Sequence, residues 1–83
     1  MDKLWSIYIL ECFDGTLYTG ASNNVDKRVA KHNNGTGSRY TKARLPVKLL
    51  FQKEIGTKSE ACKEEYRIKQ LSRAEKLEFI ENK

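Results

Sequence analysis

Two runs of strand-forming residues open the chain, at positions 4–12 and 16–22, and an Asp-Gly pair lies between them. Apolar, β-branched and aromatic side chains dominate both runs, and this composition is typical of strands. An Asp-Gly pair between two such runs favours a tight hairpin turn. The pattern therefore predicts a β-hairpin with Asp14 and Gly15 in its turn.

The length of the hairpin loop decides which side chains share a face. A two-residue loop would put Tyr8 opposite Ala21, with Tyr8 and Tyr18 on opposite faces. A three-residue loop, residues 13–15, with Gly15 in the left-handed conformation, puts Tyr8 opposite Gly20 instead. We prefer the three-residue loop because it sorts the side chains better. One face then carries Trp5, Ile7, Ile9, Leu17, Thr19 and Ala21, and the other, more polar face carries Ser6, Tyr8, Tyr18, Gly20 and Ser22. In this register Gly20 would leave room for a group to approach Tyr8.

The rest of the chain reads as one further strand and three helices. Residues 23–35 predict a short helix capped by Asn23 or Asn24, residues 36–46 a basic loop ending at the single proline, and residues 47–55 a third strand. The stretches 57–60 (TKSE) and 72–75 (SRAE) each match the capping box that opens a helix. We expect one α+β domain over residues 1–83, with a three-stranded antiparallel sheet flanked by helices in the order β-β-α-β-α-α.

Composition limits the size and the location of the protein. A chain of 83 residues has room for one modest core. Cys12 and Cys62 are isolated, so we expect reduced thiols that fill the core of a cytoplasmic protein. The apolar run at 4–10 is too short to span a membrane and has no cleavage site. Sixteen Lys and Arg against eleven Asp and Glu leave a net charge of +5, which favours a polyanionic partner such as nucleic acid.

Two helices carry side chains that could do chemistry. Arg28 and His32 lie four residues apart and project from one face of the first helix, although each alone reads as an ordinary surface or helix-end residue. Glu65 interrupts the apolar positions of the second helix, whereas Glu64 reads as a solvated partner of Arg67. A carboxylate on an apolar face either pairs with a base or binds a cation. Spacing alone favours an ion pair for Glu65, for example with Arg28.

The motifs SIYIL and LYTG, followed by DKRVAKHNNG, SRYTKARLPVKL and SEACKEEYRIKQLSRAEK, resemble the GIY-YIG nuclease superfamily. The similarity is greatest to its small stand-alone bacterial members, which consist of this domain alone, and it covers nearly the whole chain. Ser6 stands where the family's first motif has glycine, and Thr19 stands where its second motif has isoleucine. These departures leave the reacting groups in place.

The resemblance implies a metal-dependent endonuclease that hydrolyses phosphodiester bonds in DNA, with a role in repair or recombination. It makes Tyr8 and Tyr18 the two motif tyrosines, Arg28 the helix arginine, His32 the histidine one turn later and Glu65 the metal ligand. Such chemistry needs an activated water, charge neutralisation at the phosphate and help for the leaving oxygen. A single Mg²⁺ or Mn²⁺ held by one carboxylate suits this purpose. Either tyrosine could be the base. The alternative is a nucleic-acid-binding module that kept the fold and lost turnover.

The basic loop is the predicted contact with nucleic acid. Its Arg39, Lys42 and Arg44 supply cations and its Tyr40 supplies a ring on which a base could stack. An ordinary loop whose Tyr40 covers the sheet edge would show the same residues. Nothing in the loop resembles a base-reading element, so we expect recognition of the backbone or the shape of DNA.

Overall fold

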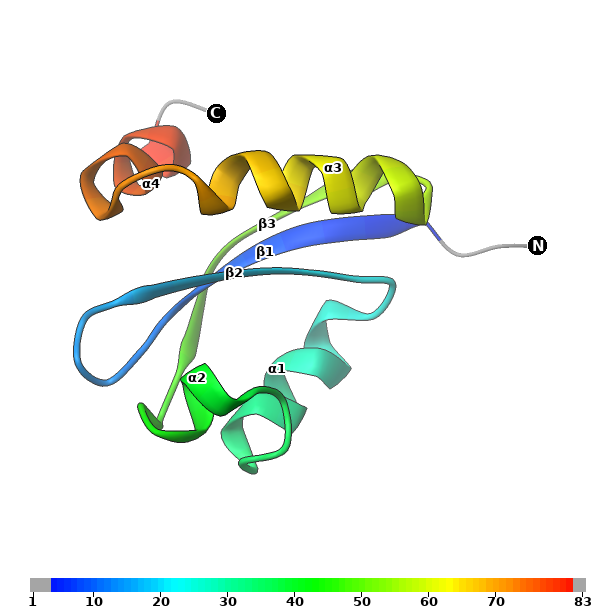
Figure 1. Cartoon of the computed structure of the whole chain (residues 1–83). Helices are drawn as coiled ribbons and strands as arrows, with labels where there is room; N and C mark the ends of the chain where they lie inside the picture. The colour runs from blue at the N-terminus through cyan, green and yellow to red at the C-terminus, as the bar shows by residue number, and fades with distance from the viewer. Residues whose placement is uncertain (1–3, 82–83) are drawn as a thin grey trace.

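The structure is a computed structural model that describes residues 4–81. Within this range, three strands and four helices follow one another: β1 (Trp5–Glu11), β2 (Leu17–Ser22), α1 (Val25–Asn33), α2 (Arg39–Lys42), β3 (Lys48–Gly56), α3 (Lys58–Lys69) and α4 (Arg73–Glu81). The sheet lies between two helical layers, with α3 and α4 on one side and α1 and α2 on the other (Figure 1). The expected α+β class is confirmed.

The sheet is antiparallel, with β1 in the centre and the strand order β2-β1-β3. Tyr8 pairs with Gly20, as the three-residue loop predicts. The loop closes through backbone hydrogen bonds from Cys12 to Thr16 and from Gly15 to Cys12, both 2.9 Å, and Gly15 has φ of +85°. This left-handed backbone favours glycine, and it fixes the register that puts both tyrosines on one face.

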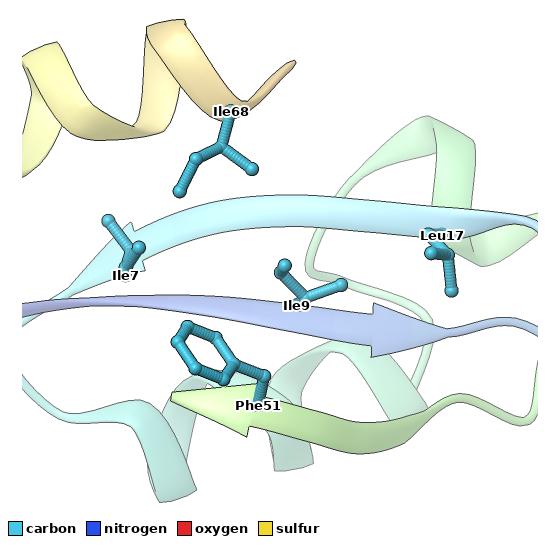
Figure 2. Packing of buried hydrophobic residues seen from close by; sticks show 5 residues of the cluster. All are labelled: Ile7, Ile9, Leu17, Phe51 and Ile68. Atoms are coloured by element: carbon cyan, nitrogen blue, oxygen red, sulfur yellow. The ribbon is translucent and has the colours of Figure 1, made fainter. Parts of the chain in front are cut away.

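The first face of the sheet packs against α3 and α4. Its core is built from five buried side chains: Ile7, Ile9, Leu17, Phe51 and Ile68. Figure 2 shows Ile68 on α3 directed at the sheet, where Ile7 and Ile9 of β1 lie. The alternation along β1 and β2 thus places the predicted apolar face under a helix, because burial of apolar surface drives this packing.

The second face, which carries the tyrosines, is also buried. Tyr8 is 1% exposed and packs with Leu10, Cys12, Val25 and Val47 beneath α1. The expectation of open space over Gly20 is wrong, because the Tyr8 ring itself fills it. A Cβ atom on Gly20 would collide with Cζ and the hydroxyl oxygen of Tyr8. Gly20 therefore serves the packing of the tyrosine ring.

The basic segment 36–46, predicted to be a loop, contains a short helix. Ser38 caps the single turn of α2, and its side chain accepts a hydrogen bond from the backbone N–H of Thr41. The order is therefore β-β-α-α-β-α-α. The missed turn is too short to show helical periodicity, so only its Ser cap could have indicated it.

Local signals at the other helix ends are confirmed. Asn24 caps α1, Thr57 and Glu60 form a reciprocal capping box at α3, and Ser72 and Glu75 form the same pair of bonds at α4. Of the two cysteines, Cys12 is buried as expected but Cys62 is exposed, so the prediction that it fills the core is wrong. No helix within residues 4–81 is long and apolar enough to cross a membrane.

Candidate active site

The site begins with a hydrogen bond between Tyr8 on β1 and His32 on α1. The Tyr8 hydroxyl lies 3.0 Å from His32 Nε2, and both side chains are buried. His32 projects onto the tyrosine face because Val25, one of the apolar residues of α1, packs the helix against that face. The sequence suggested neither this direct bond nor the full burial of His32.

Thr41 of α2 holds the other nitrogen of His32. Thr41 Oγ1 lies 2.8 Å from His32 Nδ1 and 3.0 Å from Ser38 Oγ, and Thr41 is fully buried. We assign the direction in which Tyr8 donates to Nε2, Nδ1–H donates to Thr41, and Thr41 donates to Ser38, because it gives the buried Tyr8 hydroxyl an acceptor. This arrangement leaves Nε2 as a proton acceptor facing Tyr8.

Gly37 closes the pocket that holds the imidazole. A Cβ atom on Gly37 would collide with the ring of His32 at Nδ1. Ser38, Thr41 and Gly37 all lie in the segment that the sequence reading treated only as a basic surface. The glycines and hydroxyl residues of the stretch GTGSRYT could have indicated this role. Their partner His32 lies on the preceding helix, and only folding brings it into contact with them.

Arg28 lies on the same side of α1, close enough to affect both members of the pair. Burial, and then the positive charge of Arg28, lower the pKa of His32 below its ordinary 6.5, so the imidazole is neutral at pH 7. Arg28 Nε is buried and has no hydrogen-bond partner among residues 4–81. An open pocket of about 160 Å³ adjoins the arginine, and Lys27, Lys31 and Ser22 are among the residues that line it.

Burial is also the main influence on Tyr8. It raises the pKa of the Tyr8 hydroxyl above its ordinary 10.0, and a hydrogen bond from the Arg28 side chain opposes this rise. The charges of Tyr18 and Glu65 raise the pKa further. Glu65 therefore lies within electrostatic range of Tyr8, although α3 covers the opposite face of the sheet. Another α3 side chain, Lys69, shows how close this helix comes to the tyrosines: its ammonium lies 5.7 Å from the centroid of the Tyr18 ring on the edge strand β2.

Glu65 has a different partner from the one expected. Its Oε2 lies 3.0 Å from Nζ of Lys69, four residues later on α3, and the predicted ion pair with Arg28 is absent from the part of the chain that the structure describes. Glu64 pairs with Arg67 as expected, at 3.0 and 2.7 Å. Glu65 pairs with Lys69 because residues four apart are neighbours on the surface of a helix, whereas a pair with Arg28 would depend on how two helices pack.

The possible metal ligands of the site suit a cation that keeps several water ligands. Across residues 4–81 no three His, Cys, Asp or Glu side chains gather to form a metal site. Glu65 has 21% of its side chain exposed, and its Oε1 has no partner within the same residues. A single free carboxylate oxygen suits Mg²⁺ or Mn²⁺, which keep water ligands, and does not suit zinc, which takes three or four protein ligands.

Tyr18 and Tyr40 connect this centre to the basic segment. The Tyr18 ring lies edge-on to His32, with centroids 5.2 Å apart, and stacks with Tyr40 at 5.9 Å. Arg44 lies over the Tyr40 ring at 4.0 Å, and its Nε donates to Asp14 at 3.0 Å. Arg44 is thus part of the scaffold that fixes Tyr40 against the sheet edge.

The structure brings together four of the five residues proposed to react, because Tyr8 and Tyr18 contact His32 and Arg28 acts on both Tyr8 and His32. The fifth, Glu65 on α3, is linked to them only by the effect of its charge on Tyr8. Of the four predicted nucleic-acid contacts, Tyr40 and Arg44 pack against this group, while Arg39 and Lys42 are exposed on α2 and face no acidic partner among the described residues. Lys27 and Lys31, which the sequence reading passed over, add two cations beside Arg28.

Comparison with known proteins gives a consistent result. The family model described as the GIY-YIG catalytic domain matches residues 4–78. A UPF0213 protein of Staphylococcus saprophyticus is 55% identical over 80 residues, which cover 96% of each chain, and one of Halobacterium salinarum is 54% identical over 84% of this chain and 91% of its own.

Two solved structures share the fold. The solution NMR structure of a UPF0213 protein from Bacillus halodurans aligns with a TM-score of 0.61 at 42% identity, over 95% of this chain and 84% of the other. That of a protein from E. faecalis aligns with a TM-score of 0.66 at 34% identity, over 96% and 85%.

Proposed function

Since the chain belongs to the GIY-YIG catalytic domain family, we propose that it is a divalent-metal-dependent endonuclease that hydrolyses phosphodiester bonds in DNA. The observation that carries the proposal is the buried bond from Tyr8 to neutral His32 with Arg28 beside it. These three groups supply an acid-base pair and an anion-binding cation at one place.

Tyr8 and His32 together form the proton acceptor. Burial keeps the Tyr8 hydroxyl protonated at pH 7, so Tyr8 alone is a weak base. His32 Nε2 accepts the Tyr8 proton while Tyr8 takes one from the attacking water. The bond from Nδ1 to Thr41 keeps Nε2 available for this transfer.

Arg28 binds the scissile phosphate. Arg28 lines an open pocket of about 160 Å³, so a phosphate that enters this pocket would meet its side chain. A guanidinium also neutralises charge that develops on the phosphoryl oxygens. Tyr18, held against His32, orients the water and the phosphate.

Glu65 would hold the metal through its free oxygen. The ion would supply charge neutralisation at the phosphate and at the leaving oxygen. Lys69 holds the second oxygen of Glu65 and fixes its orientation. Arg39 and Lys42 on α2 would contact the neighbouring backbone phosphates of the DNA.

A binding module without turnover is the second candidate. It is favoured by the pairing of Glu65 with Lys69, which leaves one free carboxylate oxygen for a cation. Arg28 and the exposed cations of α1 and α2 would bind phosphates equally well in such a protein.

Replacing Glu65 by alanine tests the proposal. We expect Glu65→Ala to abolish cleavage that depends on Mg²⁺ or Mn²⁺, because the metal loses its protein ligand, while DNA binding stays equal or becomes slightly tighter. Loss of a partly exposed i,i+4 pair costs only about 0.5 kcal/mol, so the variant should fold. The measurements are cleavage of single-stranded, duplex and branched DNA with metal and with chelator, binding to the same DNAs, and thermal unfolding.

Glu64→Ala is the matched control, because it removes the same charge one position away and should leave cleavage unchanged. Full cleavage by folded Glu65→Ala would refute the metal assignment. If the unmodified protein cleaves none of the DNAs but binds them in a salt-sensitive way, the binding module is the correct function.

A further inference from the structure

A second pocket lies beside the candidate site, at the opposite end of β2 from Arg28. It has a volume of about 190 Å³ and is lined by residues of β2, α2 and α4 and of the loops before β2 and α4: Thr16, Leu17, Tyr40, Leu71, Arg73 and Lys76. Among the described residues no acidic side chain lines it, whereas two cations do. Tyr40 forms one wall, and its ring also stacks with Tyr18 of the candidate site.

Lys76 is the unusual member of this pocket. It is only 8% exposed, and its ammonium has no hydrogen bond or ion pair with any residue between 4 and 81. Burial lowers the pKa of Lys76, and the charge of Lys69 lowers it further. The buried part of Lys76 is its apolar stem, because its ammonium is not among the fully buried side-chain atoms within residues 4–81 that lack a hydrogen bond. The ammonium is therefore accessible from the pocket and free to pair with a ligand there.

The surroundings of Lys76 make the pocket attractive to an anion. Lys69 adds a positive charge near it, and Arg73 is fixed at the rim because its Nε donates to the carbonyl of Gly15 at 2.7 Å. An anion in the pocket would pair with Lys76 and would relieve its repulsion by Lys69. Phosphate suits these donors, since lysine binds it as a point charge.

The two pockets border the same edge strand. Ser22, at the end of β2, lines the pocket of Arg28, and Leu17, at its start, lines the pocket of Lys76. Six residues of strand span about 17 Å, and Tyr18 lies between the ends. A nucleic-acid strand that follows this edge would meet both pockets and pass the reacting groups between them.

We propose that the pocket of Lys76 binds a backbone phosphate of the same nucleic-acid strand whose scissile phosphate lies at Arg28. This inference rests on the proposed function, which supplies the scissile phosphate at Arg28. Binding at Lys76 can nevertheless be measured without cleavage. The pocket would then set the path of the strand along β2.

The test compares Lys76→Met with Lys63→Met in binding to a single-stranded oligothymidylate of ten nucleotides across a range of salt. Methionine keeps the apolar length of the lysine stem, so Lys76→Met should fold and unfold at an equal or higher temperature. Lys63 is exposed on α3 away from both pockets, so it controls for net charge. We expect Lys76→Met to weaken binding several-fold at low salt and to reduce the log-log salt slope by about 0.7, and Lys63→Met to do neither.

A titration with inorganic pyrophosphate, followed by backbone amide NMR shifts, separates a strand phosphate from a free one. We expect shifts at Leu71, Arg73 and Lys76 in the unmodified protein and none there in Lys76→Met. Pyrophosphate shifts with an unchanged oligonucleotide slope would refute the strand path, because the pocket would bind only a free anion. An unchanged slope without pyrophosphate shifts would refute the pocket altogether.

The outcome is independent of turnover. Binding that depends on Lys76 in a protein that never cleaves DNA would support the pocket and refute the endonuclease. Metal-dependent cleavage with the same KM in Lys76→Met and the unmodified protein would refute the pocket and leave the endonuclease standing.

Discussion

His32 is the central residue of the candidate site, because it is buried and neutral and forms hydrogen bonds with groups on two other elements. It is also the only histidine of the chain. Any property that depends on imidazole protonation between pH 5 and 7 can therefore be assigned to it without ambiguity.

The stability of the protein should fall as the pH drops below about 6.5. The pKa of His32 is lowered in the folded state, so the unfolded chain takes up a proton that the folded one does not, and stability is lost from the ordinary pKa downwards. Each pKa unit of lowering is worth about 1.4 kcal/mol. Denaturant unfolding from pH 7.5 to 5 would measure the slope, which should be much shallower in His32→Gln. An equal slope in both proteins would show that His32 is not the group responsible.

Gly20 acts through the space that it leaves for the Tyr8 ring. Gly20→Ala should destabilise the protein by about 1 to 3 kcal/mol and reduce cleavage, because the added methyl group pushes the ring away from His32. Unfolding in denaturant would measure the cost. The same substitution in a Tyr8→Leu background should cost much less, and an undiminished cost would assign the effect to the backbone of β2.

At the scale of elements, α2 is the part of the site that depends most on tertiary contacts. A single helical turn is not stable by itself. It is held by Thr41 against His32, by Arg44 against Asp14, and by the stacking of Tyr40 on Tyr18. This element connects the basic surface directly to the imidazole.

Thr41→Val should change the state of the imidazole while leaving its surroundings almost unchanged in shape. The variant removes the partner of buried Nδ1, so we expect a loss of about 1 to 3 kcal/mol and reduced cleavage. Nitrogen NMR of the His32 ring should show a shift in tautomer that a purely structural defect would not produce. Thr36→Val, at an exposed threonine, is the control. Unaltered ring signals in Thr41→Val would contradict the assigned direction of donation.

At the scale of the whole molecule, the positive charges are spread over several elements that border the β2 edge. Lys27 and Lys31 lie on α1, Arg39 and Lys42 on α2, and Lys76 on α4. A net charge of +5 by itself indicates only attraction to polyanions. Because these cations lie on elements around one edge of the sheet, a polyanion would be attracted to that edge.

Replacing Arg39 and Lys42 together by alanine should reduce the log-log salt slope of duplex DNA binding by about 1.8, since each phosphate contact contributes about 0.9. Binding measured between 50 and 200 mM salt would give the slope. The pair Lys53→Ala and Lys63→Ala removes the same charge from β3 and α3 and should leave the slope unchanged. Equal reductions in both double variants would indicate a general charge effect.

The sequence by itself determined the features that arise from neighbours along the chain. The hairpin register followed from the three-residue loop with Gly15, because side chains alternate with a period of two. The caps at Thr57 and Ser72 followed from a glutamate three positions later, and the cap of the first helix was narrowed to Asn23 or Asn24. The residues of the candidate site were indicated by the family resemblance of their motifs, and their roles stay predictions.

Only the tertiary structure decided which of these residues touch. The bonds of His32 to Tyr8 and Thr41 join three elements. The pair of Glu65 with Lys69, in contrast, is an i,i+4 contact within α3 that the spacing along the sequence already allows. The burial of Lys76 needs α4 to fold back on β2 and α2. Contacts of this kind depend on how whole elements pack, and the periodicity of a segment carries no information about the partner that will cover it.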